Sequence, residues 1–318
     1  MPARSRSVLS AAVAAYYLPR MTPGDVTTRR LPYHPPFDWM RMLRFLRARS
    51  VKGVESVLED AYVRTLRVGD HAGWIRARDE PEHASLLVET SRSLTPVLPQ
   101  LLERLRHLFD LLVRPDTISL HLARDARLAS AVARRPGLRV PGAFDGFELA
   151  ARAILGQQIT VKAATTLAGR FAAAFGDPIA TPVPELTHLA PTAHRIALAH
   201  PDEIATLGII QTRARSIVAI AQEIESGRLR LAPGASPAAV IKQLVALPGI
   251  GAWTAHYIAM RALRWADAFP KEDIALRNAL GRVSAARADE LSQEWRPWRS
   301  YATLHLWCEA GEKEPIVN

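Results

Sequence analysis

A glycine-rich turn between two helix-forming segments carries the clearest chemical signal in this sequence. It reads Leu-Pro-Gly-Ile-Gly-Ala-Trp-Thr-Ala over residues 247–255. Glycine lets the backbone adopt positive φ and approach a ligand closely, and the following helix points free N–H groups and its positive dipole end at that ligand. Such a turn is suited to binding one phosphate of a nucleic acid through the backbone. A plain helix–turn–helix connection is the alternative.

A carboxylate follows the turn in the sequence. Asp273 comes shortly after Pro270, at the expected start of another helix. The helix dipole and the free N–H groups there stabilise a negative charge. An isolated aspartate at this place is a helix cap, but its position after the glycine-rich turn favours a functional role. We expect its neighbour Glu272 to be a solvated side chain.

Helices must position both features. We expect helices to dominate after residue 115, the first capped by Asp145 and the last beginning at Pro297, with others at 161–175, 201–206, 211–225, 236–246 and 252–263. Before residue 116 we expect a helix after Trp39, antiparallel strands, and a closing helix over 96–109. The strands are predicted at 62–68, 71–77 and 85–89. The predicted fold class is therefore mainly α with an N-terminal α+β domain.

The 318-residue chain is basic, with 41 Lys and Arg against 31 Asp and Glu and a net charge of +10. Arginine supplies most of the positive charge and suits phosphate recognition, although a compositional bias toward Ala and Arg is the alternative explanation. The single cysteine, Cys308, excludes an internal disulfide framework, a multi-cysteine zinc site and a four-cysteine iron–sulfur cluster. No apolar run reaches the ~20 residues of a membrane span, so we expect a soluble, cytosolic protein.

The turn and Asp273 together resemble the helix-hairpin-helix, Gly/Pro…Asp superfamily of DNA base-excision glycosylases. Three further strings resemble its alkylated-base branch, the DNA-3-methyladenine glycosylases of type II. They are Pro-Pro-Phe-Asp-Trp at 35–39, Arg-Ala-Ile-Leu-Gly-Gln-Gln at 152–158 and Pro-Trp-Arg-Ser-Tyr-Ala at 297–302. The resemblance implies an N-terminal α+β domain followed by two helical domains, with the active-site cleft between the helical pair.

That architecture gives a domain prediction. Residues 1–30 are expected to be a disordered tail, in which Met21 offers an alternative start. Residues 31–115 form the N-terminal α+β domain. The second helical domain combines 116–145 with 266–318, and the domain at 146–265 contains the helix-hairpin-helix at about 236–263.

The resemblance places Asp273 at the position of the essential aspartate. Cleavage of an N-glycosidic bond builds positive charge on the sugar, which a fixed carboxylate stabilises, and the carboxylate can also orient or deprotonate the attacking water. In family members that also cut the DNA backbone, a lysine stands at the position of Trp253. An indole cannot form a Schiff base, so the resemblance implies a water-using, monofunctional enzyme without a cofactor.

The resemblance also implies a pocket for a base flipped out of the duplex. Trp253 and Tyr257 share one face of the helix after the turn because they are four residues apart, and Trp307 and Phe45 match other pocket aromatics. An aromatic face attracts a cationic alkylpurine by ~0.5–2 kcal/mol. Core packing is the alternative use of such side chains, and we expect it for Trp39, Trp295 and Trp298.

Several DNA contacts follow from the same likeness. Gln158 matches the side chain that fills the gap left by the flipped nucleotide, where some members have an apolar residue that unstacks bases more readily. Phosphate contacts are expected at Gly249, Gly251 and Thr254. Carbonyl groups of the hairpin can hold a monovalent cation in this family, here those of Val245, Leu247 and Ile250.

We therefore expect a monomeric, monofunctional DNA glycosylase that acts on duplex DNA and removes alkylated bases, chiefly 3-methyladenine and also 7-methylguanine. One alternative is a non-catalytic helix-hairpin-helix protein that binds DNA or senses damage. A glycosylase for deaminated or etheno purines, such as hypoxanthine or ethenoadenine, is the other.

Overall fold

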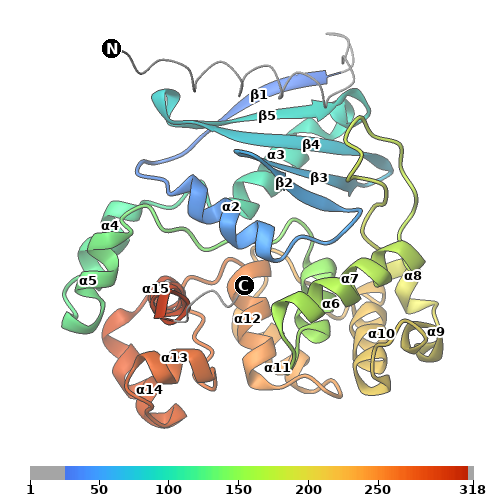
Figure 1. Ribbon diagram of the computed structural model, residues 1–318. Helices are drawn as coiled ribbons and strands as arrows, with labels where there is room; N and C mark the ends of the chain where they lie inside the picture. The colour runs from blue at the N-terminus through green and yellow to red at the C-terminus, as the bar shows by residue number, and fades with distance from the viewer. Residues whose placement is uncertain (1–25, 314–318) are drawn as a thin grey trace, which may run out of the picture.

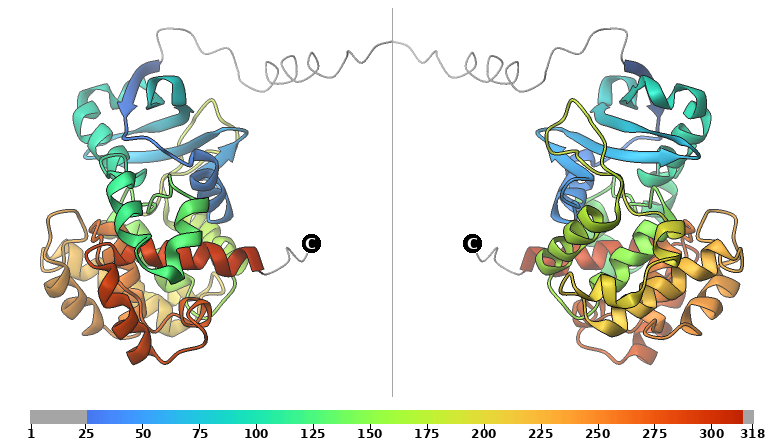
Figure 2. Two further views of the ribbon diagram at one scale, coloured as in Figure 1. Left: turned by 90° about the vertical axis from the view of Figure 1, so that its left-hand side faces the viewer. Right: turned by 90° about the vertical axis from the view of Figure 1, so that its right-hand side faces the viewer.

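The computed structural model describes residues 26–313 and has an antiparallel sheet at one end of the molecule and helices at the other (Figures 1 and 2). The sheet has the strand order β1-β5-β4-β3-β2, and each neighbouring pair is antiparallel. Its strands are β1 (Val26–Pro32), β2 (Glu55–Leu58), β3 (Ala61–Val68), β4 (His71–Glu80) and β5 (Ser85–Ser91). The three predicted strands correspond to β3, β4 and β5.

The tail predicted for residues 1–30 is wrong at its end, because residues 26–30 belong to β1. Val26 pairs with Ser91, and Arg30 pairs with Leu87. The Val-Thr-Thr start of this segment favours a strand. Its side chains are largely exposed, as is typical at a sheet edge, so the sequence lacks the alternating apolar residues by which a strand is predicted. Met21 and the rest of the predicted tail lie outside the described residues.

Two helices pack on the sheet and complete the N-terminal core. They are α2 (Trp39–Ala48) and α3 (Leu98–Leu108). Asp38 caps α2 by accepting the Arg41 backbone N–H at 3.0 Å. Trp39 is buried, as predicted, and its indole N–H donates to the Asp60 carbonyl at 2.8 Å. This packing directs the far side of α2 toward the helical part of the chain.

The remainder of the described chain is helical, which confirms the predicted fold class. The helices are α4 (Pro115–Leu122), α5 (Ala126–Arg134), α6 (Gly146–Leu155), α7 (Val161–Phe175), α8 (Ala193–Ala197), α9 (Pro201–Ala205), α10 (Gln211–Glu225), α11 (Pro237–Val245), α12 (Ala252–Ala262), α13 (Ile274–Ala279), α14 (Ala285–Leu291) and α15 (Arg299–Lys313). Short 3₁₀ segments occur at Pro81–His83, Arg92–Val97 and Ser292–Trp295. The predicted cap of α6 is present, since Asp145 accepts the Glu148 N–H at 2.8 Å. The last helix begins at Arg299, two residues after the predicted Pro297.

The helices enclose two separate apolar cores. One joins α6, α7, α10, α11 and α12, and the other joins α4 and α5 to α13, α14 and α15 around Trp295. Trp295 is fully buried, as predicted, and Trp298 packs against the same core while partly exposed. We propose that these cores and the N-terminal core define three domains. Within residues 26–313, no helix combines the length and apolarity needed to cross a membrane.

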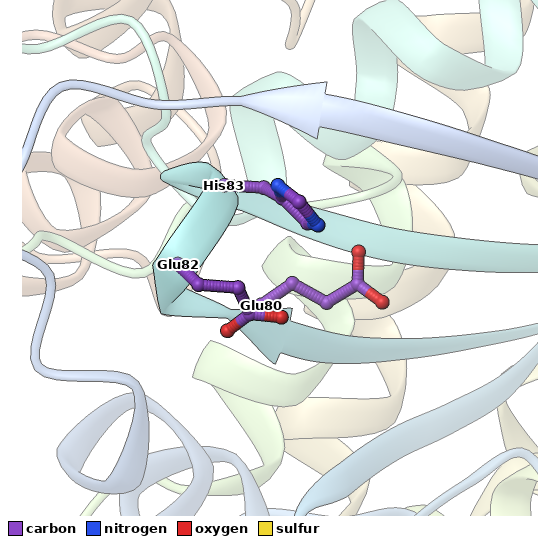
Figure 3. Close-up of side chains that lie close together, drawn as sticks. All are labelled: Glu80, Glu82 and His83. Atoms are coloured by element: carbon purple, nitrogen blue, oxygen red, sulfur yellow. The ribbon is translucent and has the colours of Figure 1, made fainter.

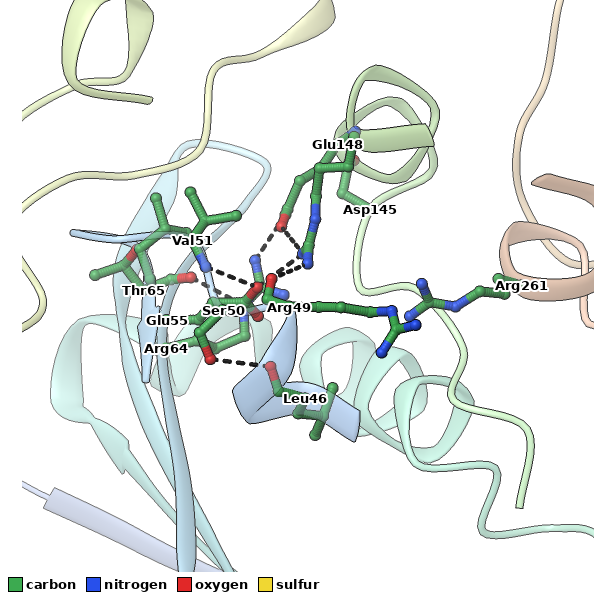
Figure 4. A network of polar contacts seen from close by, with 12 residues as sticks. Leu46, Arg49, Ser50, Val51, Glu55, Arg64, Thr65, Asp145, Glu148 and Arg261 are labelled. Carbon is green, nitrogen blue, oxygen red and sulfur yellow. Dashed lines mark hydrogen bonds and ion pairs between the residues drawn. The ribbon is translucent and has the colours of Figure 1, made fainter. Parts of the chain in front are cut away.

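A buried ion-pair cluster fixes the sheet and α2 to α6 (Figure 4). Arg64 of β3 pairs with Glu148 at 2.7 Å, and Arg152 of α6 pairs with Glu55 at 2.7 Å. Arg152 also donates to the carbonyl of Arg49, the residue that ends α2. Because each buried charge has an opposite partner, these contacts set where the end of α2 lies relative to the helical core.

Candidate active site

The hairpin between α11 and α12 has a backbone that only glycine adopts readily at one position. Gly249 has φ +77°, and a Cβ there would collide with the hydroxyl of Ser216. That hydroxyl donates to the Pro248 carbonyl at 2.6 Å, which ties the hairpin to α10. Ser216 is distant in sequence, so the motif alone gave no sign of this contact.

Gln157 ties a second segment to the hairpin. Its side-chain amide donates to the Gly249 carbonyl at 3.0 Å and to the Thr254 hydroxyl at 3.1 Å, while Arg213 of α10 donates to its backbone carbonyl. The next residue, Gln158, is exposed and has φ +56°. The structure therefore holds the predicted gap-filling residue on a loop fastened to the hairpin, through a neighbour that the sequence did not single out.

The hairpin offers backbone amides to the solvent. Gly251 is exposed and precedes α12 as its N-cap, without a side-chain cap, so the first N–H groups of the helix lack intrahelical acceptors. The side chain of Thr254 is buried and its hydroxyl bonds to Gln157. The expected phosphate contact of Thr254 is therefore limited to its backbone N–H, because the hydroxyl faces the protein.

Asp273 is the N-cap of α13 and also accepts hydrogen bonds from two indoles. Its Oδ1 accepts the Leu276 backbone N–H at 2.7 Å and the Trp307 Nε1–H at 3.1 Å. Its Oδ2 accepts the Trp253 Nε1–H at 2.8 Å. The helix cap and the proposed functional role are thus compatible, since three donors fix one carboxylate and Oδ2 keeps an acceptor position. The sequence placed these aromatics in a base pocket but did not predict their bonds to the aspartate.

The aromatic rings form a continuous cluster beside Asp273. Trp253 and Tyr257 stack with their centroids 5.3 Å apart at an interplanar angle of 7°, and Tyr257 lies 6.3 Å from Trp307 at 48°. The stacked pair is in direct contact, so a base cannot enter between Trp253 and Tyr257 unless they separate. A flipped base that leaves this pair intact must use another ring face.

Arginine side chains lie between Phe45 and this aromatic cluster and contact its ring. The guanidinium carbon of Arg49 lies 4.0 Å from the centroid of the Phe45 ring, and that of Arg261 lies 5.0 Å from it. Arg261 also lies over the Tyr257 ring at 5.4 Å. The predicted pocket aromatic thus has guanidinium groups over its ring. Arg261 could have been found from its four-residue spacing after Tyr257 on the same helix.

Two family descriptions match this chain. The AlkA N-terminal domain matches residues 28–145, and the HhH-GPD superfamily base excision DNA repair protein matches residues 151–299. DNA-3-methyladenine glycosylase 2 of Escherichia coli (strain K12) is 36% identical over 281 residues, which cover 88% of this chain and 97% of that protein. The chain belongs to the HhH-GPD superfamily. It is a DNA glycosylase of base excision repair, and DNA is its substrate.

Two further known proteins are similar to this chain. The probable bifunctional transcriptional activator/DNA repair enzyme AlkA of Mycobacterium tuberculosis is 38% identical over 307 residues, covering 95% of this chain and 60% of that protein. The structure of a 3-methyladenine DNA glycosylase from Archaeoglobus fulgidus has a TM-score of 0.76 at 21% identity, covering 89% of this chain and 98% of that one. The latter likeness shows the shared fold.

One group of side chains in the described part of this HhH-GPD chain is close enough to hold a metal ion. Glu80, Glu82 and His83 gather at the turn between β4 and β5 (Figure 3). Glu80 already pairs with Arg30 at 2.8 Å and with Arg78 at 3.4 Å. A cation would have to compete with both arginines for this carboxylate, and the cluster lies in the sheet, apart from the hairpin.

Proposed function

We propose that this HhH-GPD glycosylase is monofunctional and hydrolyses the N-glycosidic bond of alkylated bases in duplex DNA, chiefly 3-methyladenine and also 7-methylguanine. The observation that carries the proposal is the carboxylate of Asp273 held by two indoles beside the glycine-rich hairpin. The Escherichia coli relative is a DNA-3-methyladenine glycosylase, which supports 3-methyladenine as a substrate. The assay is release of free purines from methylated duplex DNA, and failure to release any would contradict the proposal.

The acceptor geometry of Asp273 supports its role in the reaction. Oδ1 accepts two hydrogen bonds, whereas Oδ2 accepts one from Trp253. Oδ2 is therefore the oxygen that can face the sugar or the attacking water. As the bond to the base breaks, positive charge develops on the sugar and the fixed carboxylate stabilises it without having to reorganise. The water oxygen then forms the new bond to the sugar carbon.

A variant of Trp307 tests whether the indoles serve the carboxylate or only line a pocket. Trp307→Phe keeps an aromatic ring near Tyr257 but removes the N–H that donates to Asp273. Loss of one such bond costs about 1 kcal/mol, so single-turnover base release should fall about fivefold. Affinity for undamaged duplex should not change. Unchanged rates would show that this bond does not support the reaction.

The absence of strand cleavage is a separate prediction. Trp253 stands where a lyase would carry its lysine, and the nearby Lys271 bonds through Nζ to Asp289 at 3.1 Å. We expect no covalent enzyme–DNA product under borohydride reduction and no nicking before alkali treatment. If a covalent product forms, the Lys271→Met variant identifies whether this amine is the nucleophile, and the monofunctional assignment is withdrawn.

The hairpin also suggests a mode of DNA binding. We infer that the amides at Gly249 and Gly251 bind one phosphate and that Gln158 fills the gap left by the flipped nucleotide. An alkali cation suits hard oxygen ligands, and we propose the backbone carbonyls of Val245, Leu247 and Ile250 for this role. The Leu247 carbonyl accepts the Ile250 N–H at 3.3 Å. We further propose that the protein acts as a monomer, which light scattering of the DNA complex tests.

A further inference from the structure

Arg261 is a buried cation without an acidic partner in the described part of the chain. It is 6% exposed, and its three hydrogen bonds go to neutral oxygens: the Pro141 carbonyl at 2.7 Å, the Gly142 carbonyl at 3.0 Å and the Tyr257 hydroxyl at 2.7 Å. Burying a charge costs free energy that an opposite charge usually offsets. Within residues 26–313 no carboxylate forms an ion pair with Arg261, so its positive field extends into the aromatic cluster that it contacts through Tyr257.

A second guanidinium strengthens this positive end of the site. Arg49 extends from the end of α2 toward Arg261, as Figure 4 shows, and both lie over the Phe45 ring. Burial lowers the pKa of Arg49, and repulsion by Arg261 lowers it further. Burial alone would raise the pKa of Tyr257, yet the pKa is lowered because Arg261 and Arg49 favour a negative charge on its oxygen. The positive potential is thus felt at the aromatic cluster.

The charges of the site are therefore ordered along α12. Asp273 bonds to Trp253, Trp253 stacks on Tyr257, and Tyr257 bonds to Arg261. The negative end lies where charge develops on the sugar in the proposed reaction. The positive end lies beyond the rings that are proposed to receive the base.

We propose that Arg261 is a specificity-determining residue that favours release of neutral lesion bases relative to cationic ones. This inference rests on the proposed function. The C1′–N bond breaks with both electrons going to the base, water forms the new C1′–O bond, and the proton of the water passes to Asp273 or solvent. A neutral base such as hypoxanthine departs with a negative charge and then takes a proton from solvent. A cationic base such as 7-methylguanine departs neutral, so a positive charge stabilises only the first departure.

Paired substrates test this inference. Single-turnover release is measured with saturating enzyme on duplexes that carry one hypoxanthine or one 7-methylguanine. For Arg261→Met we expect the rate ratio of hypoxanthine to 7-methylguanine to fall about tenfold relative to wild type. Arg261→Lys keeps a positive charge, so both rates fall but their ratio stays close to that of wild type. An Arg261→Met variant in which both rates fall equally would show a purely structural role and overturn the inference.

Two other variants serve as a substitute and as a control for Arg261→Met. If Arg261→Met does not fold, Arg49→Met removes the second guanidinium and should shift the ratio in the same direction by a smaller factor; an unchanged ratio overturns the inference. The matched control is Arg139→Met, because Arg139 is also buried and donates to backbone carbonyls, but it lies over Phe37 of the N-terminal core, at 5.0 Å, and not over the aromatic cluster of the site. Its ratio should equal that of wild type.

The same assay separates this inference from the proposed function. A wild-type protein that releases neither base contradicts the proposed function itself. Release of 7-methylguanine without any release of hypoxanthine leaves that function in place and overturns the role given to Arg261. Release of both bases, with a ratio that depends on the charge at position 261, supports both.

Discussion

Asp273→Asn should lower base release by roughly 10³-fold or more while leaving DNA affinity intact. The asparagine side chain has the shape of the carboxylate and can still accept the Leu276 N–H that caps α13. It carries no charge to stabilise the developing sugar cation, and its NH₂ group cannot accept the Trp253 N–H. Free 3-methyladenine and 7-methylguanine are measured after incubation with methylated duplex DNA, and affinity is measured by fluorescence anisotropy on a duplex with an abasic analogue.

Glu272→Gln is the matched control for this prediction. Glu272 is exposed and adjacent in sequence, so its variant removes the same unit of charge from the same turn without touching the indoles. We expect its release rate to stay within about twofold of wild type, as for a solvated surface charge. Activity that survives in Asp273→Asn would remove Asp273 from the mechanism. A wild type that binds abasic DNA tightly but releases no base would instead favour a non-catalytic damage sensor.

Local sequence patterns were sufficient for the long helices and for the cap at Asp273. The predicted helices at 161–175 and 211–225 match α7 and α10 at both ends, because each has a strong start or stop signal around a regular apolar face. β2 is only four residues long and β1 lies at the sheet edge, so neither showed the alternation by which the other strands were recognised. Element boundaries therefore failed where local preference was weak and tertiary pairing decided the structure.

Local spacing predicted neighbours in the candidate site only where the residues share one element, and the family resemblance supplied the others. The four-residue spacing placed Trp253 and Tyr257 on one face, and they stack. The meeting of Trp253 and Trp307 at Asp273 depends on how α12, α13 and α15 pack, which no local pattern encodes. Arg49 comes from α2 in the N-terminal domain, where the buried ion pairs to α6 determine its position. Long-range packing thus decides which donors and charges surround the carboxylate.

Gly249→Ala should weaken binding to duplex DNA by at least about tenfold. A left-handed conformation costs a residue with a Cβ about 1–2 kcal/mol, and the added carbon would displace the Ser216 hydroxyl that holds the Pro248 carbonyl. The hairpin amides would then no longer converge on a phosphate. The relaxed hairpin of the variant must regain the left-handed conformation to bind a phosphate, so this strain and the lost contact both weaken binding, and about 1.4 kcal/mol is a tenfold change in affinity.

Variants at two other glycines distinguish the effect of backbone strain on stability from the effect of a lost phosphate contact on DNA affinity. Gly227 has φ +73° with nothing near its missing side chain, so Gly227→Ala should lower the melting temperature without changing DNA affinity. Gly251 is not in the left-handed region and also has open space; Gly251→Ala should therefore fold normally but weaken DNA binding, because its Cβ crowds an approaching phosphate. Affinity is measured against salt concentration, where a phosphate-dominated complex weakens steeply as salt rises. A flat salt response in wild type, or unchanged affinity in both hairpin variants, would remove the hairpin from the DNA interface.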